Sequence, residues 1–204
     1  MPVITFYERD SEQEGGGSIH LLEAIQKDSS NTSEEFIPFT AKEDNGEEIS
    51  NFSILSKDEF GNTIETLNGD DTFLLSDLNA NVGSLCARKT DNPKSSLSAI
   101  DLIRMSKMVI NGTSPCKTDF IAADVNRSGK VSALDIIQTL NIIIGNSNHF
   151  VENESWRFYP SELDISNLTL DQIYENSCIS IDEINTSNAI FFSGVKLGDI
   201  KCNP

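Results

Sequence analysis

The chain has few basic residues and no long apolar run. It contains 15 lysines and arginines against 32 aspartates and glutamates, and its formal net charge is −17 at pH 7. Nucleic acids and anionic membranes are bound by basic surfaces, so this charge argues against both as partners. The apolar stretches fall short of the roughly 20 residues that a membrane-spanning helix needs. We therefore expect no nucleic-acid partner and no membrane insertion.

Side chains that commonly form catalytic and zinc centres are also scarce. The chain has only two histidines, His20 and His149, and neither has sequence neighbours that suggest a triad or a general base. None of the four cysteines lies in a Cys-x-x-Cys pair, which argues against zinc. The acids show no sign of the two carboxylates that a glycosidase places across a cleft. We interpret the chain as a non-enzyme.

The four cysteines are instead compatible with disulfides. An even number of cysteines without metal-binding spacing is typical of an oxidising compartment, so we expect a secreted or cell-surface location. Four cysteines allow three pairings, and free buried cysteines are the alternative. Our hypothesis pairs Cys86 with Cys116 and Cys178 with Cys202.

Residues 124–135, Asp-Val-Asn-Arg-Ser-Gly-Lys-Val-Ser-Ala-Leu-Asp, have the spacing of a calcium-binding loop. Oxygen-bearing side chains fall at positions 1, 3, 5, 9 and 12, and glycine falls at position 6, where such a loop turns sharply. The alternative is an Asx-turn that caps a helix without a metal. The predicted calcium ligands are Asp124, Asn126, Ser128, Lys130 through its carbonyl, Ser132 and Asp135.

A helix-like apolar stripe follows this loop, and the same combination occurs once before. The second stripe ends at Gly145-Asn146 and the first at Asn111-Gly112, which are helix-stop signals. Asp101 and Asp135 are equivalent and lie 34 residues apart, within Ser-Ala-Ile-Asp-Leu-Ile and Ser-Ala-Leu-Asp-Ile-Ile. Two copies of a loop-plus-helix unit can bury each other's apolar stripes, which neither copy can do alone.

Residues 90–146 resemble type I dockerin modules, the duplicated calcium-loop-plus-helix domains of secreted bacterial proteins. The second loop is close to the dockerin pattern, whereas in the first loop Thr90 replaces an acid, Lys94 an oxygen ligand and Ser95 the glycine. The resemblance implies one calcium ion in the second loop and a second site, weak or lost, in the first. The candidate ligands of that first site are Asn92, Ser98 and Asp101, with Asp199 as a further carboxylate.

The flanking segments extend the resemblance. Residues 36–89 are similar to a small β-sandwich, like the regulatory domain of carboxypeptidases, that precedes such dockerins. Residues 147–204 resemble a C-terminal extension of the same proteins, through Ser155-Trp156-Arg157-Phe158 and the Gly198-Asp199 segment. Residues 1–35 are an N-terminal segment or linker with a strand-like run that can pair with a neighbouring chain. The predicted fold class is mixed: a small β-sandwich, then an α-helical dockerin-like calcium-loop/helix duplication with a C-terminal extension packed on it.

Two functions of different classes follow. The first is a calcium-dependent attachment module that binds a protein partner, as dockerins bind cohesins. The second is a structural unit of a calcium-stabilised adhesin, fibre or surface layer that assembles with copies of itself. A carbohydrate-binding module that stacks a glycan on Trp156 is the weaker third function, because we expect that ring to pack inside the fold.

The partner-contact positions distinguish the first two functions. Dockerins usually carry hydroxyl pairs at these positions, so the apolar residues found here can instead pack on the β-sandwich. An open face favours attachment, whereas a covered face favours a structural role. The residues concerned are Ala99, Ile100, Ala133 and Leu134.

Overall fold

The computed structural model describes residues 36–70, 72–74, 78–114, 116–150, 154–184 and 189–202. All of them belong to one unit of the chain, Glu35–Pro204. The predicted N-terminal segment, residues 1–35, lies outside the described residues.

One four-stranded sheet is antiparallel throughout, in the order β3-β2-β5-β7. Its strands are β2 (Ser53–Lys57), β3 (Thr63–Asn68), β5 (Ser84–Arg88) and β7 (Cys178–Ser180). The β2–β3 turn is held by Asp58, whose Oδ1 accepts hydrogen bonds from the backbone N–H groups of Phe60 (2.9 Å) and Asn62 (2.8 Å). Gly61 has φ +82°, a left-handed conformation that glycine adopts without steric cost.

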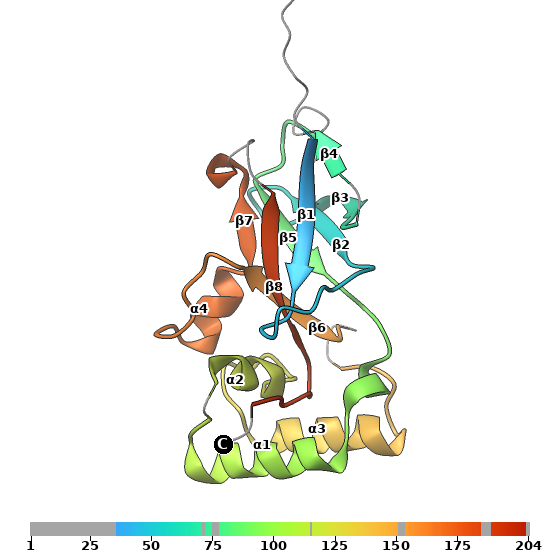
Figure 1. Ribbon diagram of the computed structural model, residues 1–204, viewed down its shortest axis with the longest axis vertical. Helices are drawn as coiled ribbons and strands as arrows, with labels where there is room; N and C mark the ends of the chain where they lie inside the picture. Colours follow the sequence, from blue (N-terminus) through green and yellow to red (C-terminus); the bar gives the residue numbers. More distant parts are fainter. Residues whose placement is uncertain are drawn as a thin grey trace, which may run out of the picture. The chain divides into compact units, whose positions relative to one another are not determined.

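A second four-stranded sheet is mixed, in the order β4-β1-β8-β6. Its strands are β1 (Phe36–Lys42), β4 (Thr72–Leu74), β6 (Trp156–Pro160) and β8 (Ile190–Lys196). β8 pairs parallel with β1 and antiparallel with β6. Strand β8 therefore lies between these two strands, and Figure 1 shows it beside β1, although it is the last of the described strands in sequence.

The two sheets share one apolar core. Side chains alternate across a strand, so every second residue of β1 faces inward, and Ile37, Phe39 and Ala41 are all buried. Ile54 and Leu85 from the other sheet and Phe192 from β8 belong to the same core and are fully buried. The two sheets therefore stabilise each other by burying this shared apolar surface.

The predicted fold class was wrong in its order of parts. The chain does not form a β-sandwich that is complete before a helical module begins, although the mixed class is compatible with the structure. Among the described strands, β6, β7 and β8 all follow the first three helices, which lie within residues 99–144, and each sheet contains at least one of these strands. Without β8, strand β1 would keep an unpaired edge and β6 would be detached from the sheet, which leaves backbone groups unsatisfied.

The helical region lies at the end of the unit away from β4 (Figure 1). Helices α1 (Ala99–Asn111) and α3 (Ala133–Ile144) lie side by side where the apolar stripes predict them. Both begin with a capping box and end at a left-handed glycine, Gly112 and Gly145. Helices α2 (Lys117–Ala123) and α4 (Leu170–Glu175) and the 3₁₀ helices Pro93–Ser96 and Ile181–Glu183 complete the helices of the described residues.

Two disulfides are present, but the hypothesised pairing was wrong. Cys86 is bonded to Cys178 and Cys116 to Cys202. Cys86 and Cys178 are opposite each other in the β5–β7 ladder, with Cα atoms 4.3 Å apart, so the strand register decides this pair. Two disulfides fit a secreted protein. Within the part of the chain that the structure describes, no helix has the length and apolar character needed to span a membrane.

Candidate calcium loop and helical face

The loop after α2 folds around the carboxylate of Asp124, which is fully buried. Its Oδ1 accepts a hydrogen bond from the backbone N–H of Ser128 (2.8 Å), and its Oδ2 accepts one from that of Gly129 (2.9 Å). The side-chain oxygen of Asn126 also accepts from the Ser128 N–H, at 3.0 Å. Arg127 and Gly129 adopt left-handed backbone conformations, with φ +56° and +77°, and these turn the chain around the carboxylate.

Asp135 closes the loop at the start of α3. Its Oδ2 accepts hydrogen bonds from the backbone N–H and the hydroxyl of Ser132, both at 2.8 Å, and its Oδ1 accepts from the backbone N–H of Asn126 at 3.3 Å. The Ser128 hydroxyl donates to the Lys130 carbonyl at 3.1 Å. The structure therefore brings all six predicted ligand residues of the second loop into one hydrogen-bonded network.

These residues fit a calcium ion. Two carboxylates, an amide oxygen, hydroxyls and a carbonyl are the hard oxygen ligands that calcium prefers. Burial raises the pKa of Asp135 above its usual value, and the charge of Asp124 raises it further, although the bonds from Ser132 and Asn126 act in the opposite direction. A bound cation would compensate this buried negative charge. The loop uses only two carboxylates, and no group of three or more His, Cys, Asp or Glu side chains suited to a metal occurs among the described residues.

The second loop is also held by α4, which sequence reasoning missed. The Tyr174 hydroxyl donates a hydrogen bond to Asp124 Oδ2 at 2.9 Å. Burial, and after it the charge of Asp124, raises the pKa of Tyr174. Asp171 lies so close to Gly129 that a Cβ at that glycine would come within 2.3 Å of its Oδ1. Tyr174 is 50 residues from Asp124 in sequence, so no local pattern signals this contact.

We expect Tyr174→Phe to weaken calcium binding by about tenfold, because groups that orient a metal ligand typically contribute 10–100-fold to affinity. The change removes only the hydroxyl that donates to Asp124. Calorimetric titration of chelator-stripped protein measures the effect. The matched control is Tyr159→Phe, whose buried hydroxyl donates to Asp44, a residue outside the loop, at 3.4 Å. Equal losses in the two variants would contradict a specific role for Tyr174.

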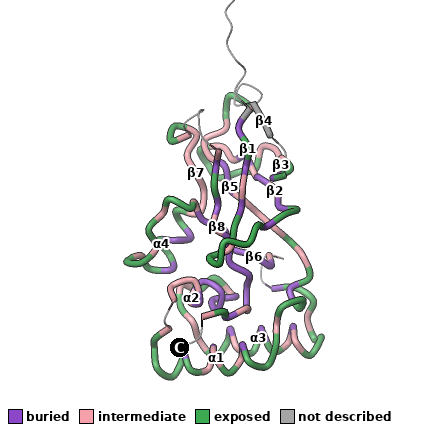
Figure 2. Tube along the Cα trace, in the orientation of Figure 1, coloured by how far each residue is buried: buried purple, intermediate pink, exposed green. Residues whose placement is uncertain are grey.

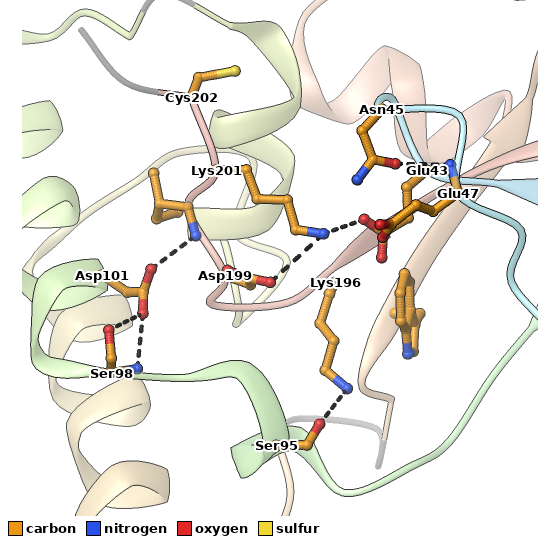
Figure 3. A network of polar contacts seen from close by, with 12 residues as sticks. Glu43, Asn45, Glu47, Ser95, Ser98, Asp101, Lys196, Asp199, Lys201 and Cys202 are labelled. Carbon is orange, nitrogen blue, oxygen red and sulfur yellow. Dashed lines mark hydrogen bonds and ion pairs between the residues drawn. The ribbon is translucent and has the colours of Figure 1, made fainter.

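The first loop brings its predicted residues together differently. Asp101 is buried and repeats the cap of the second copy, since its Oδ2 accepts from the Ser98 N–H and hydroxyl, both at 2.8 Å (Figure 3). Asn92 instead caps the 3₁₀ helix by accepting from the Lys94 N–H at 3.0 Å. Burial raises the pKa of Asp199; the nearby charge of Asp101 adds to this effect, and Lys201 opposes it. The Asp199 carboxylate forms an ion pair with Lys201, at 3.8 Å.

The outer side of α1 and α3 exposes large apolar side chains at matching positions. Ala99 and Ala133 are exposed as well, so all four predicted partner-contact residues are open to solvent. Figure 2 shows exposed stretches along both helices. We call the following three pairs the helical face; the members of each pair lie 34 residues apart. They are Ile100 (57% exposed) and Leu134 (54%), Ile103 (57%) and Ile137 (53%), and Ile110 (81%) and Ile144 (56%).

Trp156 packs in the core, as predicted. Its ring is stacked near Phe158, with centroids 6.3 Å apart, and only 7% of the residue is exposed. Its indole N–H donates to Asp91 Oδ2 at 3.0 Å. This position does not leave the ring free to stack on a sugar.

No match to this chain was found among protein-family models, curated proteins or solved structures.

Proposed function

We propose that this protein is a non-catalytic, extracellular calcium-binding module for protein attachment, similar in action to a dockerin. Calcium would bind in the loop 124–135, and a protein partner would bind the helical face. The observation that carries the proposal is the exposure of that face. Its three pairs repeat at the same positions of the two copies and remain uncovered by the sheets.

An exposed apolar surface of this kind is costly in water and commonly marks an interaction site. Burial of a whole leucine or isoleucine side chain contributes roughly 1.5–3 kcal/mol, so six half-exposed side chains would contribute on the order of 5–9 kcal/mol before the costs of association. The open face at Ala133 and Leu134 favours attachment over packing on the sheets. The two disulfides support a location outside the reducing cytoplasm.

The test uses a panel of immobilised type I cohesin modules as the probe. We expect binding in calcium and none after chelation, and we expect Ile137→Glu to weaken binding by at least about 30-fold, which corresponds to an interface residue worth about 2 kcal/mol. Phe60→Glu is the matched control, because Phe60 is 88% exposed on the β2–β3 turn and lies outside the helical face. Both substitutions are at exposed positions, so the melting temperatures should change little.

Failure of every cohesin to bind, or an equal loss in both variants, would contradict attachment to such a partner. Sedimentation velocity of the calcium-loaded protein then tests the remaining alternative, which is self-assembly in a structural role. Concentration-dependent assembly that Ile137→Glu prevents would favour the structural role, in which copies of the chain pair through the helical face.

A further inference from the structure

The first loop contains a positive charge that comes from the protein itself. Lys196, the last residue of β8, is nearly buried, with 6% of its side chain exposed. Its ammonium group contacts Asp91 Oδ1 at 2.8 Å, the Ser95 hydroxyl at 3.0 Å and the Asn92 carbonyl at 3.4 Å. Figure 3 shows the side chain reaching Ser95. An ammonium group has three N–H donors, so these three oxygens can satisfy all of them.

The backbone of the first loop cannot copy the second. The second loop turns through left-handed residues at Arg127 and Gly129. The equivalent residues in the first loop are Pro93 and Ser95, and both lie in the 3₁₀ helix Pro93–Ser96. Proline holds φ near −65°, so Pro93 cannot adopt the conformation of Arg127. The first loop therefore follows a different path and lacks the turn that wraps the second loop around its ligands.

The C-terminal tail satisfies the other end of the first loop. Asp101 Oδ1 accepts a hydrogen bond from the backbone N–H of Ile200 at 3.1 Å. Its counterpart, Asp135 Oδ1, bonds within its own loop to Asn126. The tail is anchored next to this contact by the disulfide between Cys116 and Cys202. Donors from one continuous segment, residues 196–200, therefore bond to both ends of the first loop.

The ion pair between Lys196 and Asp91 is embedded in further contacts. The Lys196 ammonium lies 5.2 Å from the centre of the Trp156 ring, and the indole of that tryptophan donates to the same Asp91 carboxylate. Burial by itself would raise the pKa of Asp91. The hydrogen bonds from Lys196, Trp156 and Ser155, together with the charge of Lys196, outweigh burial and leave the pKa below its usual value. The surroundings of Asp91 thus favour its charged form next to the ammonium.

We infer that the first loop is closed to calcium, because Lys196 and the Ile200 N–H supply the positive groups that a metal ion would otherwise supply. The chain then binds a single calcium ion, in the loop 124–135. With the proposed function as its basis, the inference extends to the helical face. Calcium orders only the half carried by α3, whereas the half carried by α1 is held in place by the protein's own lysine.

Hydrogen exchange of the whole chain, with and without calcium, tests this inference. In the wild-type protein we expect peptides that cover 91–101 to exchange equally in both conditions, and peptides that cover 124–135 to gain protection with calcium. Lys196→Gln should speed exchange of 91–101 by at least about tenfold in both conditions, because it removes the cation that is paired with the Asp91 carboxylate. Lys201→Gln is the matched control, since Lys201 lies in the same tail but pairs with Glu43 and Asp199.

Calcium-dependent protection of 91–101 in the wild-type protein, or two calcium ions per chain, would overturn the inference. Unchanged exchange of 91–101 in Lys196→Gln would also overturn it. If Lys196→Gln does not fold, Asp91→Asn removes the same ion pair with a smaller change of shape and must speed exchange of 91–101. Absence of calcium binding anywhere would defeat the proposed function, while exchange in the Lys196 and Asp91 variants would still decide how the first loop is held.

Discussion

Calorimetric titration of chelator-stripped protein with calcium is expected to show one binding event per chain, and Asp135→Asn is expected to abolish it. The variant removes the charge of a fully buried residue that is a predicted ligand, while an asparagine oxygen can still accept the hydrogen bonds from Ser132. The control is Asp101→Asn, the equivalent residue of the first copy, which makes the same cap with Ser98. We expect Asp101→Asn to leave calcium binding intact, because both substitutions affect a helix cap but only Asp135 belongs to the proposed calcium loop.

Calcium binding should also raise the free energy of unfolding. Calcium at 100 times its dissociation constant stabilises the folded state by about 2.7 kcal/mol, because the unfolded loop offers no assembled site. For a unit of this size, that corresponds to a rise in melting temperature of roughly 5–11 °C. Thermal unfolding with calcium and with chelator measures the shift. No heat of binding and no shift at calcium concentrations of about 1 mM, typical of extracellular modules, would mean that the loop is a metal-free helix cap.

Removal of either disulfide is expected to cost about 4–5 kcal/mol of unfolding free energy in the chain-entropy estimate. The two bonds join residues 92 and 86 positions apart, so that estimate gives them nearly the same value. Urea unfolding of Cys86→Ser/Cys178→Ser and of Cys116→Ser/Cys202→Ser, compared with the oxidised wild-type protein, measures each cost. Because the two bonds close chain segments of nearly equal length, each double variant is the control for the other. A difference between their unfolding free energies measures how differently the two bonds stabilise the folded state.

Loss of the two disulfides should loosen different parts of the chain. Cys178 ties the three-residue edge strand β7 to β5, so loss of that bond should increase exchange in β7 first. Cys202 ties down the tail that delivers the Ile200 N–H to Asp101, so its loss should loosen residues 91–101. Unfolding midpoints within experimental error of the wild-type value for both variants would show that the unfolded-state constraint is not what these bonds contribute.

Local patterns in the sequence were sufficient for the second loop and the two long helices. The spacing of oxygens from Asp124 to Asp135, the left-handed requirement at Gly129 and the helix stop at Gly145 each depend on residues a few positions apart. The packing of Trp156 was also predictable, because a large ring beside other apolar residues is usually buried. The open helical face was raised only as one of two alternatives, since periodicity places residues on a helix side but does not say what covers that side.

Strand pairing and long-range contacts were not predictable in this way. The insertion of β8 between β1 and β6 joins segments about 150 residues apart, and no local periodicity specifies the partner of a strand. The bond between Cys86 and Cys178 follows from the β5–β7 register, so it could not be predicted without knowing that these two strands pair. Lys196 and Tyr174 act on loops 105 and 50 residues away, which only the tertiary fold brings near them.

The sequence by itself therefore determined the acidic character, the two equivalent capped helices and the turn of the second loop, because these depend on composition and short spacings. The tertiary structure alone decided which strands share a sheet, which cysteines pair and which distant groups bond to the first loop. Those outcomes depend on contacts between distant segments. One such contact is the ion pair between Lys196, at the end of β8, and Asp91, in the degenerate first loop.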